Sequence, residues 1–305
     1  MSDYELRVIE QNREKERQTK LIADIELYIK HFFSVYNKND RRNVETLNQH
    51  IIKLINLDPE LYTAQNIGGQ NLGMICAGYG LEKVVLHVLE NYAASVQQDC
   101  VGQNLGMYAA ENNMDIAVLK ALDNNTASLQ VDNRGENIGH KAAQRGMRRA
   151  ILKAIQNKKA ACQQDKNGYN IGMICAKRGF VKETWNALDN DKAAVQQNDE
   201  GMNIGMLAAA HCNVELKTDG EMEKAVCKAL DNKKAAKQQD NEGNTIGIYA
   251  ISNSLPLASE RAISNPEARV IKNNLGKSME DYYHMNKHLV RLLLEKYDRE
   301  LIQGK

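Results

Sequence analysis

A short motif that recurs every 33 residues constrains the fold of this 305-residue chain more than any other feature. Asn-Leu-Gly-Met at 71–74 returns at 104–107, and related tetrapeptides begin at Asn137, Asn170 and Asn203. A sixth copy begins at Thr245, 42 residues after the fifth, which places nine extra residues between these two copies. Repeats of this length pack mainly on their neighbours and so stack into an array. We therefore expect a repeat array over about residues 66–250.

The residues around each tetrapeptide predict a tight turn that leads into a helix. In the second copy, Asp99 and Gly102 stand at the first and last positions of the turn, where Asp, Asn and Gly are favoured. Asn104 follows two residues later, and its side-chain oxygen can accept a hydrogen bond from a free amide at a helix start. The same columns occur in all six copies, with Thr245 as the last cap. Each repeat should begin with a turn and an N-capped helix.

The rest of each repeat predicts a second helix. The first helix is short, because nine residues after the cap the chain has Gly or Asn, which tolerate the left-handed backbone at a helix end, as at Asn113. Apolar residues at helical spacing follow, such as Ile116, Leu119 and Leu122. The helix should end at a recurring Asp-Asn pair, after which a Gln-Gln stretch leads into the next turn.

Period, turn, cap and helices together resemble the ankyrin repeat, whose pattern runs Asp-x-x-Gly-x-Thr-Pro-Leu-His-x-Ala-Ala. Residues 99–110 match this pattern in register and without gaps, and the resemblance covers about residues 66–250. It implies an all-α helical-repeat solenoid that binds partner proteins and is not an enzyme. Here Thr-Pro-Leu-His has become Asn-(Ile/Leu)-Gly-Met, and only His140 keeps the family's histidine. The array is therefore divergent.

The glycine of the tetrapeptide is the departure that most needs a physical reason. Glycine inside a helix costs about 1 kcal/mol relative to alanine. The column is nevertheless glycine in all six copies, from Gly73 to Gly247. We expect neighbouring first helices to approach each other too closely at this column for a side chain, with the following Met filling the core.

The ends of the array should be closed by helical caps. Residues 1–65 are expected to form an N-terminal cap with a degenerate repeat at 43–65, preceded by an apolar stripe: Leu21, Ile22, Ile25, Tyr28, Ile29, Phe32 and Phe33. Residues 251–305 are expected to hold an insertion at about 253–283, disordered or functional, and a closing helix over 288–294. A shorter, polar irregularity falls at about 211–223. Both lie between the two helices of a repeat.

Composition narrows the classes of partner and compartment. The formal charge is +1, with 40 Lys and Arg against 39 Asp and Glu, which argues against nucleic acid or a membrane surface as the main partner. Six cysteines without a CxxC pair are interpreted as small buried residues in a reducing compartment. No stretch of 18 apolar residues occurs, and no apolar core of a secretion signal is recognised. A soluble, cytoplasmic protein is the expectation.

No residue pattern predicts catalysis, a metal or a cofactor. His211-Cys212 lacks an orienting third group, and the pair His284 and His288 lacks an accompanying metal-site motif. Two alternatives to a binding scaffold stay open. One is an enzyme whose site is built by the C-terminal insertion, with Glu260, Arg261 and His284 as candidates. The other is a structural protein that self-associates.

The family resemblance also implies which residues contact a partner, namely those at turn tips and on the exposed side of first helices. These are Gln98, Gln103, Glu111, Asn112, Asn133, Arg134, Glu136, Gln144, Arg145, Lys166, Asn167, Tyr169, Lys177, Arg178, Asp199 and Glu200. Arg134, Arg145, Lys166, Lys177 and Arg178 predict an acidic partner. The divergent array with its appended caps is also similar to ankyrin-repeat effectors that intracellular bacteria deliver into host cells, which implies a host target and the host cytoplasm.

Overall fold

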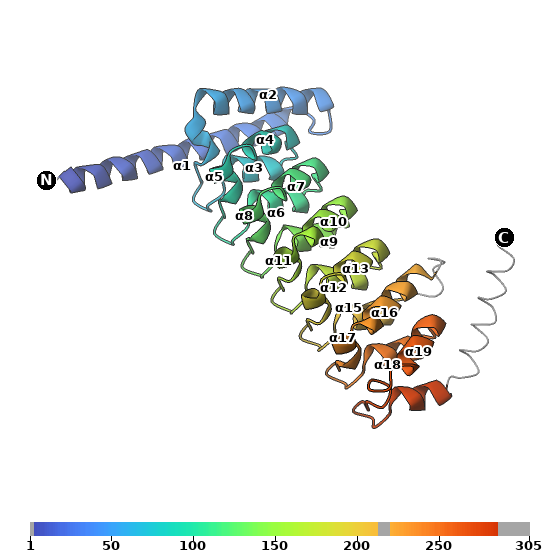
Figure 1. The fold of residues 1–305 in the computed structure, drawn as a ribbon. Helices are drawn as coiled ribbons and strands as arrows, with labels where there is room; N and C mark the ends of the chain where they lie inside the picture. The colour runs from blue at the N-terminus through green and yellow to red at the C-terminus, as the bar shows by residue number, and fades with distance from the viewer. Residues whose placement is uncertain (1–2, 213–219, 286–305) are drawn as a thin grey trace. The chain divides into compact units, whose positions relative to one another are not determined.

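The computed structural model describes residues 3–212 and 220–285, and these residues form two long N-terminal helices followed by short helices joined by turns (Figure 1). Within them, extended pairing is limited to isolated antiparallel bridges, such as that between Gln98 and Asn104. The predicted all-α fold is confirmed. The chain divides into two compact parts, an N-terminal half of residues 1–154 and a C-terminal half of residues 155–305.

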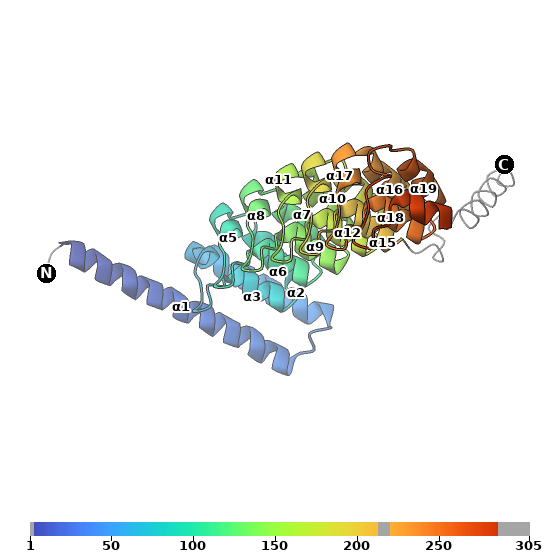
Figure 2. The same ribbon diagram turned by 90° about the horizontal axis from the view of Figure 1, so that it is seen from below.

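The N-terminal half begins with the long helix α1 (Asp3–Val35), helix α2 (Arg41–Leu57) and the short 3₁₀ helix η1 (Pro59–Tyr62). Repeats follow in which the first helices α3, α6 and α9 pack in one row and the second helices α4 and α7 pack in another (Figure 2). The bounds are α3 (Leu72–Gly78), α4 (Glu82–Val88), α5 (Tyr92–Val96), α6 (Leu105–Glu111), α7 (Asp115–Ala121), α8 (Asn125–Leu129), α9 (Ile138–Arg145) and α10 (Arg148–Gln156).

The C-terminal half has the same two rows. First helices α12, α15 and α18 pack together, and second helices α13, α16 and α19 do likewise. The irregularity expected at 211–223 lies between α15 and α16, and residues 213–219 are outside the described part. The bounds are α11 (Lys158–Ala161), α12 (Ile171–Lys177), α13 (Val181–Ala187), α14 (Asp191–Ala194), α15 (Ile204–Ala210), α16 (Glu221–Asp231), α17 (Lys233–Lys237), α18 (Ile246–Ser252) and α19 (Pro256–Ile263).

The predicted helix N-caps are present, and the capping asparagines also form hydrogen bonds to the exit helix of the same repeat. Asn104 Oδ1 accepts a hydrogen bond from the Met107 amide at 3.1 Å, as an N-cap should. Its Nδ2 also donates to Ala127 O at 2.8 Å and to Gln130 Oε1 at 2.9 Å. Asn71, Asn170 and Asn203 make the equivalent bonds. A threonine hydroxyl can cap but has a single proton to donate, so it could not make both donated bonds, which accounts for Asn in place of the family's Thr.

A short exit helix, which the sequence pattern did not indicate, closes the repeats. The Asp-Asn pair was expected only to end the second helix. Asn124 instead caps α8, because its Oδ1 accepts from the amides of Thr126 at 3.0 Å and Ala127 at 3.2 Å. Asn91, Asn157, Asn190 and Asn232 cap the corresponding helices. The asparagine therefore starts an exit helix shortly after the second helix ends, and at Asn232 one residue both ends α16 and starts α17.

The helix glycines stand where the backbone has no room for a side chain. A Cβ added at Gly106 would meet Ala121 Cβ at 2.8 Å and would overlap the Ile138 side chain of the next repeat. At Gly205 it would lie 2.6 Å from both Ala229 Cβ and Ile246 Cδ1. The expected close approach is therefore confirmed, and it involves the second helix of the same repeat as well as the next first helix.

The core matches the predicted pattern except at some cysteines. Met74, Met107, Met173 and Met206 are buried, so the methionine column is core packing. Cys76 and Cys175 are fully buried in the position that other repeats give to alanine. Cys100, however, is exposed at a turn tip, and Cys162, Cys212 and Cys227 are only partly buried. The expectation that all six are buried was wrong, because Cys100 lies in a turn and not in a helix row.

At the N-terminus, α1 and α2 bury one apolar side each. Ile22, Ile25, Ile29 and Phe32 of α1 are buried, as are Leu47, Ile51 and Ile55 of α2. The Phe33 ring stacks on that of Tyr79 in the first clear repeat, with centroids 6.1 Å apart. Helix α2 packs on α4, the second helix of that repeat. Both helices thus supply the apolar surface that an N-terminal cap requires, and the boundary at residue 65 stays a prediction.

The insertion expected at 253–283 is replaced by repeat structure. Helix α19 packs on α16 and α18 as a second helix, and a turn like the others follows at 273–276, with Gly276 at φ 72°. Ser278 stands 33 residues after Thr245 and caps a helix over 279–285. The pattern was missed because Glu280 occupies the glycine column. The boundary at residue 250 stays a prediction, and the closing helix expected over 288–294 lies outside the described residues.

Replacing Gly106 by Ala should lower the melting temperature. Overpacking costs about 1–3 kcal/mol, which should exceed the gain of about 1 kcal/mol in helix propensity. Gly78, at the end of α3, is the matched control, because nothing lies within 4 Å of a Cβ added there. Gly78→Ala should leave the melting temperature unchanged or raise it. Equal melting temperatures for the two variants, followed by circular dichroism, would reject the close approach.

Candidate protein-binding surface

The turn tips are held by two sets of hydrogen bonds. Within the second turn, Asp99 Oδ1 accepts from the amides of Val101 at 3.0 Å and Gln103 at 2.7 Å. Between turns, the Cys100 amide donates to Gly68 O at 2.9 Å, and the Asn133 amide donates to Val101 O at 2.9 Å. We call these inter-turn bonds the turn ladder. The backbone of the tips is therefore fixed at the spacing of the repeats.

Gln98, which is predicted to contact a partner, belongs to this framework instead. Gln98 donates from Nε2 to Gly102 O at 2.5 Å and to Val131 O of the next repeat at 3.0 Å. Gln164, Gln197 and Gln239 make the same pair of bonds in the C-terminal half. The side-chain amide of Gln98 is thus committed to holding adjacent repeats together.

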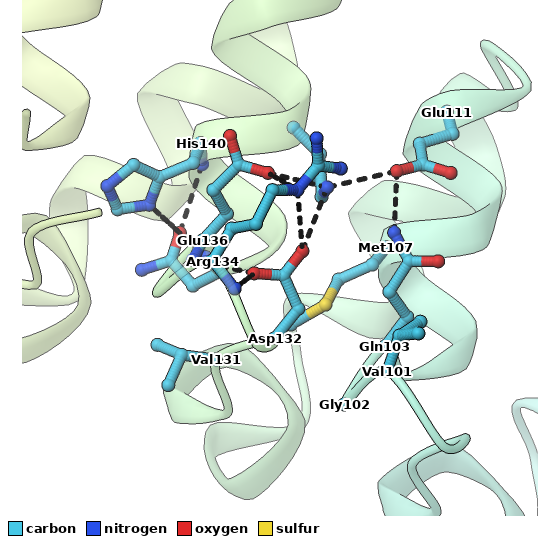
Figure 3. Close-up of polar contacts among 12 residues, drawn as sticks. Val101, Gly102, Gln103, Met107, Glu111, Val131, Asp132, Arg134, Glu136 and His140 are labelled. Atoms are coloured by element: carbon cyan, nitrogen blue, oxygen red, sulfur yellow. Dashed lines mark hydrogen bonds and ion pairs between the residues drawn. The ribbon is translucent and has the colours of Figure 1, made fainter. Parts of the chain in front are cut away.

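A buried ion-pair cluster lies at the first helices of the N-terminal half. The carboxylates of Glu111, Asp132 and Glu136 converge from two repeats (Figure 3). Their common partner is Lys141 on α9, whose Nζ lies 3.0 Å from Glu111, 3.0 Å from Asp132 and 2.6 Å from Glu136. The Lys141 side chain is only 1% exposed. We call these four residues and Arg134 the Lys141 cluster.

The electrostatics of the cluster favour its charged state. Burial acts to raise the pKa of Asp132, but hydrogen bonds from the Glu136 amide and from Lys141 outweigh it and leave that pKa lowered. Burial likewise acts to lower the pKa of Lys141, yet its bonds to Glu136, Asp132 and Glu111 leave that pKa raised. Each partner keeps the other ionised, so the cluster is an internal salt bridge.

The cluster also engages predicted contact residues of the N-terminal half. Gln103 donates to Glu111 Oε1 at 2.6 Å, and Gln144 donates to Glu136. Arg134 Nε lies 3.4 Å from Glu136 Oε2, although the Arg134 side chain is 66% exposed. Asn112, Asn133 and Arg145 are exposed. The positive charge of Arg134 is therefore paired within the protein, and its role in partner contact stays a prediction.

In the C-terminal half, the predicted residues of the fourth repeat form a basic group with aromatic support. Lys166 and Asn167 are exposed at the turn tip, and Lys177 and Arg178 are exposed at the end of α12. Lys177 Nζ lies 5.1 Å from the centre of the Tyr169 ring and 3.5 Å from its hydroxyl. The Arg178 guanidinium lies 5.3 Å from the centre of the Phe180 ring.

The fifth repeat is acidic at its tip. Asp199 and Glu200 are both exposed, and their carbonyls accept bonds from Asn241 of the sixth turn at 2.8 and 3.0 Å. His211, at the end of α15, lies close to both kinds of charge. Burial lowers its pKa, the charge of Lys177 lowers it further, and the charge of Glu200 acts in the opposite direction. The pKa of His211 therefore reflects a basic side chain of the fourth repeat and an acidic side chain of the fifth.

Candidates for chemistry gain no support from the geometry. Burial raises the pKa of Cys212 to about 11, so the thiol beside His211 is protonated near neutral pH. Arg261 forms an ion pair with Asp231, Glu260 is exposed on α19, and His284 lies in the next helix; His288 is outside the described residues. The described part of the chain holds no cluster of three side chains suited to a metal. None of the helices in this part of the chain is both long and apolar enough to cross a bilayer.

Lys141 is the residue that sequence reasoning missed. Four residues after the cap, the other repeats carry Ile75, Tyr108, Ile174, Leu207 and Tyr249, and only the third copy places a charge there. A lysine in an otherwise apolar or aromatic column indicates a buried cation that requires partners. Three carboxylates at nearby turn and first-helix positions could have been recognised as those partners.

Comparison with known proteins identifies the fold. No family model and no curated protein matches the sequence significantly. An ankyrin repeat protein designated EF0377 is similar in structure, with 16% identity over 64% of this chain and 96% of that chain and a TM-score of 0.51. The ankyrin repeat domain of Bcl-3, a member of the IkappaB protein family, is similar at 14% identity over 69% and 90%, also with a TM-score of 0.51. The chain thus has the ankyrin-repeat fold that its sequence pattern implied.

Replacing Lys141 by Met should destabilise the N-terminal half strongly. The substitution leaves carboxylates buried without their cation, and breaking a buried pair costs about 3–5 kcal/mol. Lys83→Met is the matched control, because Lys83 forms a more exposed pair with Glu45 at 2.6 Å. That variant should lose about 1 kcal/mol or less. Urea unfolding measures both, and equal losses would contradict the structural role of Lys141.

Proposed function

We propose that the protein is a scaffold that binds a partner protein through its turn tips and the exposed ends of its first helices. The observation that carries the proposal is that these side chains project from a backbone fixed by the turn ladder. A surface held in place before binding loses less conformational freedom on association. The similar solved structures share only the fold at low sequence identity. The kind of partner therefore follows from the chemistry of this surface.

Within this surface, we place the anchor in the fourth repeat. Among the described residues, no carboxylate lies within ion-pair distance of Lys166 or Lys177, whereas Arg134 is already paired with Glu136. Lys177 and Tyr169 together offer a cation and an aromatic ring, and Arg178 adds a second exposed cation. Arg and Tyr are frequent anchors of protein interfaces. An acidic segment of a partner suits these residues best.

The acidic turn tip of the fifth repeat should set the orientation of the bound partner segment. Asp199 and Glu200 follow the basic patch by one repeat. A partner segment that places acidic residues on the fourth repeat should therefore place neutral or basic residues on the fifth. Opposite charges across an interface favour the correct register, and like charges disfavour the reverse orientation. The same repulsion explains why nucleic acid is a poor candidate partner.

The resemblance to effectors of intracellular bacteria extends the proposal. On this hypothesis the scaffold acts in the cytoplasm of a host cell by occupying or recruiting a host protein, without catalysis. The alternatives are an enzyme that uses Glu260, Arg261 and His284, and a structural protein that self-associates. Turnover of a lysate component would favour the first, and concentration-dependent sedimentation would favour the second.

The double variant Lys177→Glu/Arg178→Glu should lose partner binding by at least about tenfold, because it reverses both charges of the anchor. Lys158→Glu/Lys159→Glu on α11 is the matched control, with the same change in net charge on an exit helix. The measurement is affinity capture from candidate host lysate with quantitative mass spectrometry, at low and high salt. Full capture by the first variant, with an unchanged circular dichroism spectrum, would show that the location is wrong.

A further inference from the structure

The turn ladder has an open end at Ile67. At the second, third, fifth, sixth and seventh turns, the second residue donates its amide to a carbonyl of the preceding turn. The donor–acceptor distances are 2.9 Å for Cys100, 2.9 Å for Asn133, 3.1 Å for Asp199, 3.0 Å for Asn241 and 2.9 Å for Asn274. Ile67 occupies the same position in the first turn, which no turn precedes. Its amide has no partner among the described residues.

Helix α1 takes over only part of the missing turn. In the next repeats, the carbonyl before the turn accepts from the preceding glutamine, as Val131 O accepts from Gln98 at 3.0 Å. In the first repeat, Gln65 O accepts instead from Thr19 Oγ1 of α1 at 3.2 Å. The helix thus pairs the carbonyl of Gln65 and leaves the amide of Ile67 open.

A groove separates α1 from this turn. It has a volume of ≈ 700 Å³, and its lining includes Thr19 and Ala23 from the helix and Ile67 and Gly68 from the turn. That volume lies in the range of pockets that hold small ligands. Ile67 is 96% exposed, which leaves an apolar surface at the edge of the groove.

The charges of the groove cancel. Lys15 and Lys20 are balanced by Glu16 and Glu26 along the same wall. An occupant therefore needs no net charge, in contrast to a segment bound at Lys177. The groove offers the Ile67 amide as a backbone donor, the exposed Ile67 side chain as an apolar contact, and space where other turns have a preceding turn.

We propose that this groove binds an uncharged peptide segment of a partner protein, in the place that a preceding turn would take. A backbone carbonyl of the segment accepts a hydrogen bond from the Ile67 amide, and an apolar side chain of the segment packs on Ile67. The occupant continues the turn ladder by the same bond that joins the turns already present. Recognition through main-chain hydrogen bonds with alternate side chains in pockets is a known physical mode. The site goes beyond the proposed function, since it uses no charged anchor.

A synthetic peptide tests the site. The probe is acetyl-Ala-Gln-Asn-Ile-Gly-Gly-Gln-amide, which copies residues 64–70. It includes the copy of Gly68, whose carbonyl accepts a hydrogen bond from the Cys100 amide in the protein. Titration of the ¹⁵N-labelled full chain should shift the amide signals of Ile67, Gly68, Thr19 and Ala23. The dissociation constant should change by less than about twofold between low and high salt, because the contacts are uncharged. Shifts confined to other regions would overturn the proposal.

Two substitutions separate the hydrogen bond from the side-chain contact. Ile67→Pro removes the amide, and proline is favoured at the second position of such a turn, so the fold should persist. It should weaken the peptide at least about fivefold, as expected for the loss of one hydrogen bond. Ile67→Val keeps the amide and should bind within about twofold of the wild type.

Two other outcomes would count against the site. Wild-type affinity for Ile67→Pro would overturn the proposal. So would self-association of the chain, seen by sedimentation as an oligomer that Ile67→Pro dissociates, because the occupant would then be a second copy. The Lys177→Glu/Arg178→Glu variant should bind the peptide normally. If the Lys177→Glu/Arg178→Glu variant disproves the charged anchor, the groove at Ile67 is still supported by peptide binding. Loss of the groove proposal likewise leaves the charged anchor untouched.

Discussion

Pairing of the backbone polar groups in very short helices is the interaction on which the rest of the structure depends. A seven-residue helix leaves most of its terminal amides and carbonyls without intrahelical partners, and it is marginal alone. Asn104 supplies one partner at the start of α6 and ties that start to the exit helix through Ala127 O. Gln130 then reaches back to Val96 O of the preceding repeat at 2.6 Å. One asparagine and one glutamine thereby link successive repeats.

This pairing divides the surface between structural and available side chains. Gln98 and Gln103 lie at positions where the ankyrin pattern implies partner contacts, yet their amide groups are bound to neighbouring residues. Glu136 is likewise committed to Lys141. Lys177 and Asp199 occupy comparable places in the C-terminal half and project from the same kind of framework without such a commitment. A divergent array therefore cannot be assigned a binding surface by position alone.

The sequence predicts those parts of the fold that local columns control. The turn glycine, the capping asparagine and the close approach at Gly106 each follow from a residue type at a fixed place in the repeat. The seventh repeat escaped notice because Glu280 breaks the tetrapeptide, while the turn and the cap at Ser278 preserve the geometry. Lys141 carries a signal of its own, a charge in an otherwise apolar or aromatic column, but its partners come from more than one repeat and must be found by comparing neighbouring repeats. The pairing of Arg134 with Glu136 depends on the same cluster.

Hydrogen exchange at the turn tips tests most directly whether hydrogen bonds between repeats hold this surface. Cys100 and Asn133 are exposed, so their amides would exchange rapidly if the tips were independent loops. Because each donates to the preceding turn, both amides should be protected by at least about a hundredfold relative to an unfolded peptide. The Ile67 amide should exchange near the unfolded rate. Exchange at Cys100 and Asn133 as fast as at Ile67 would contradict the account.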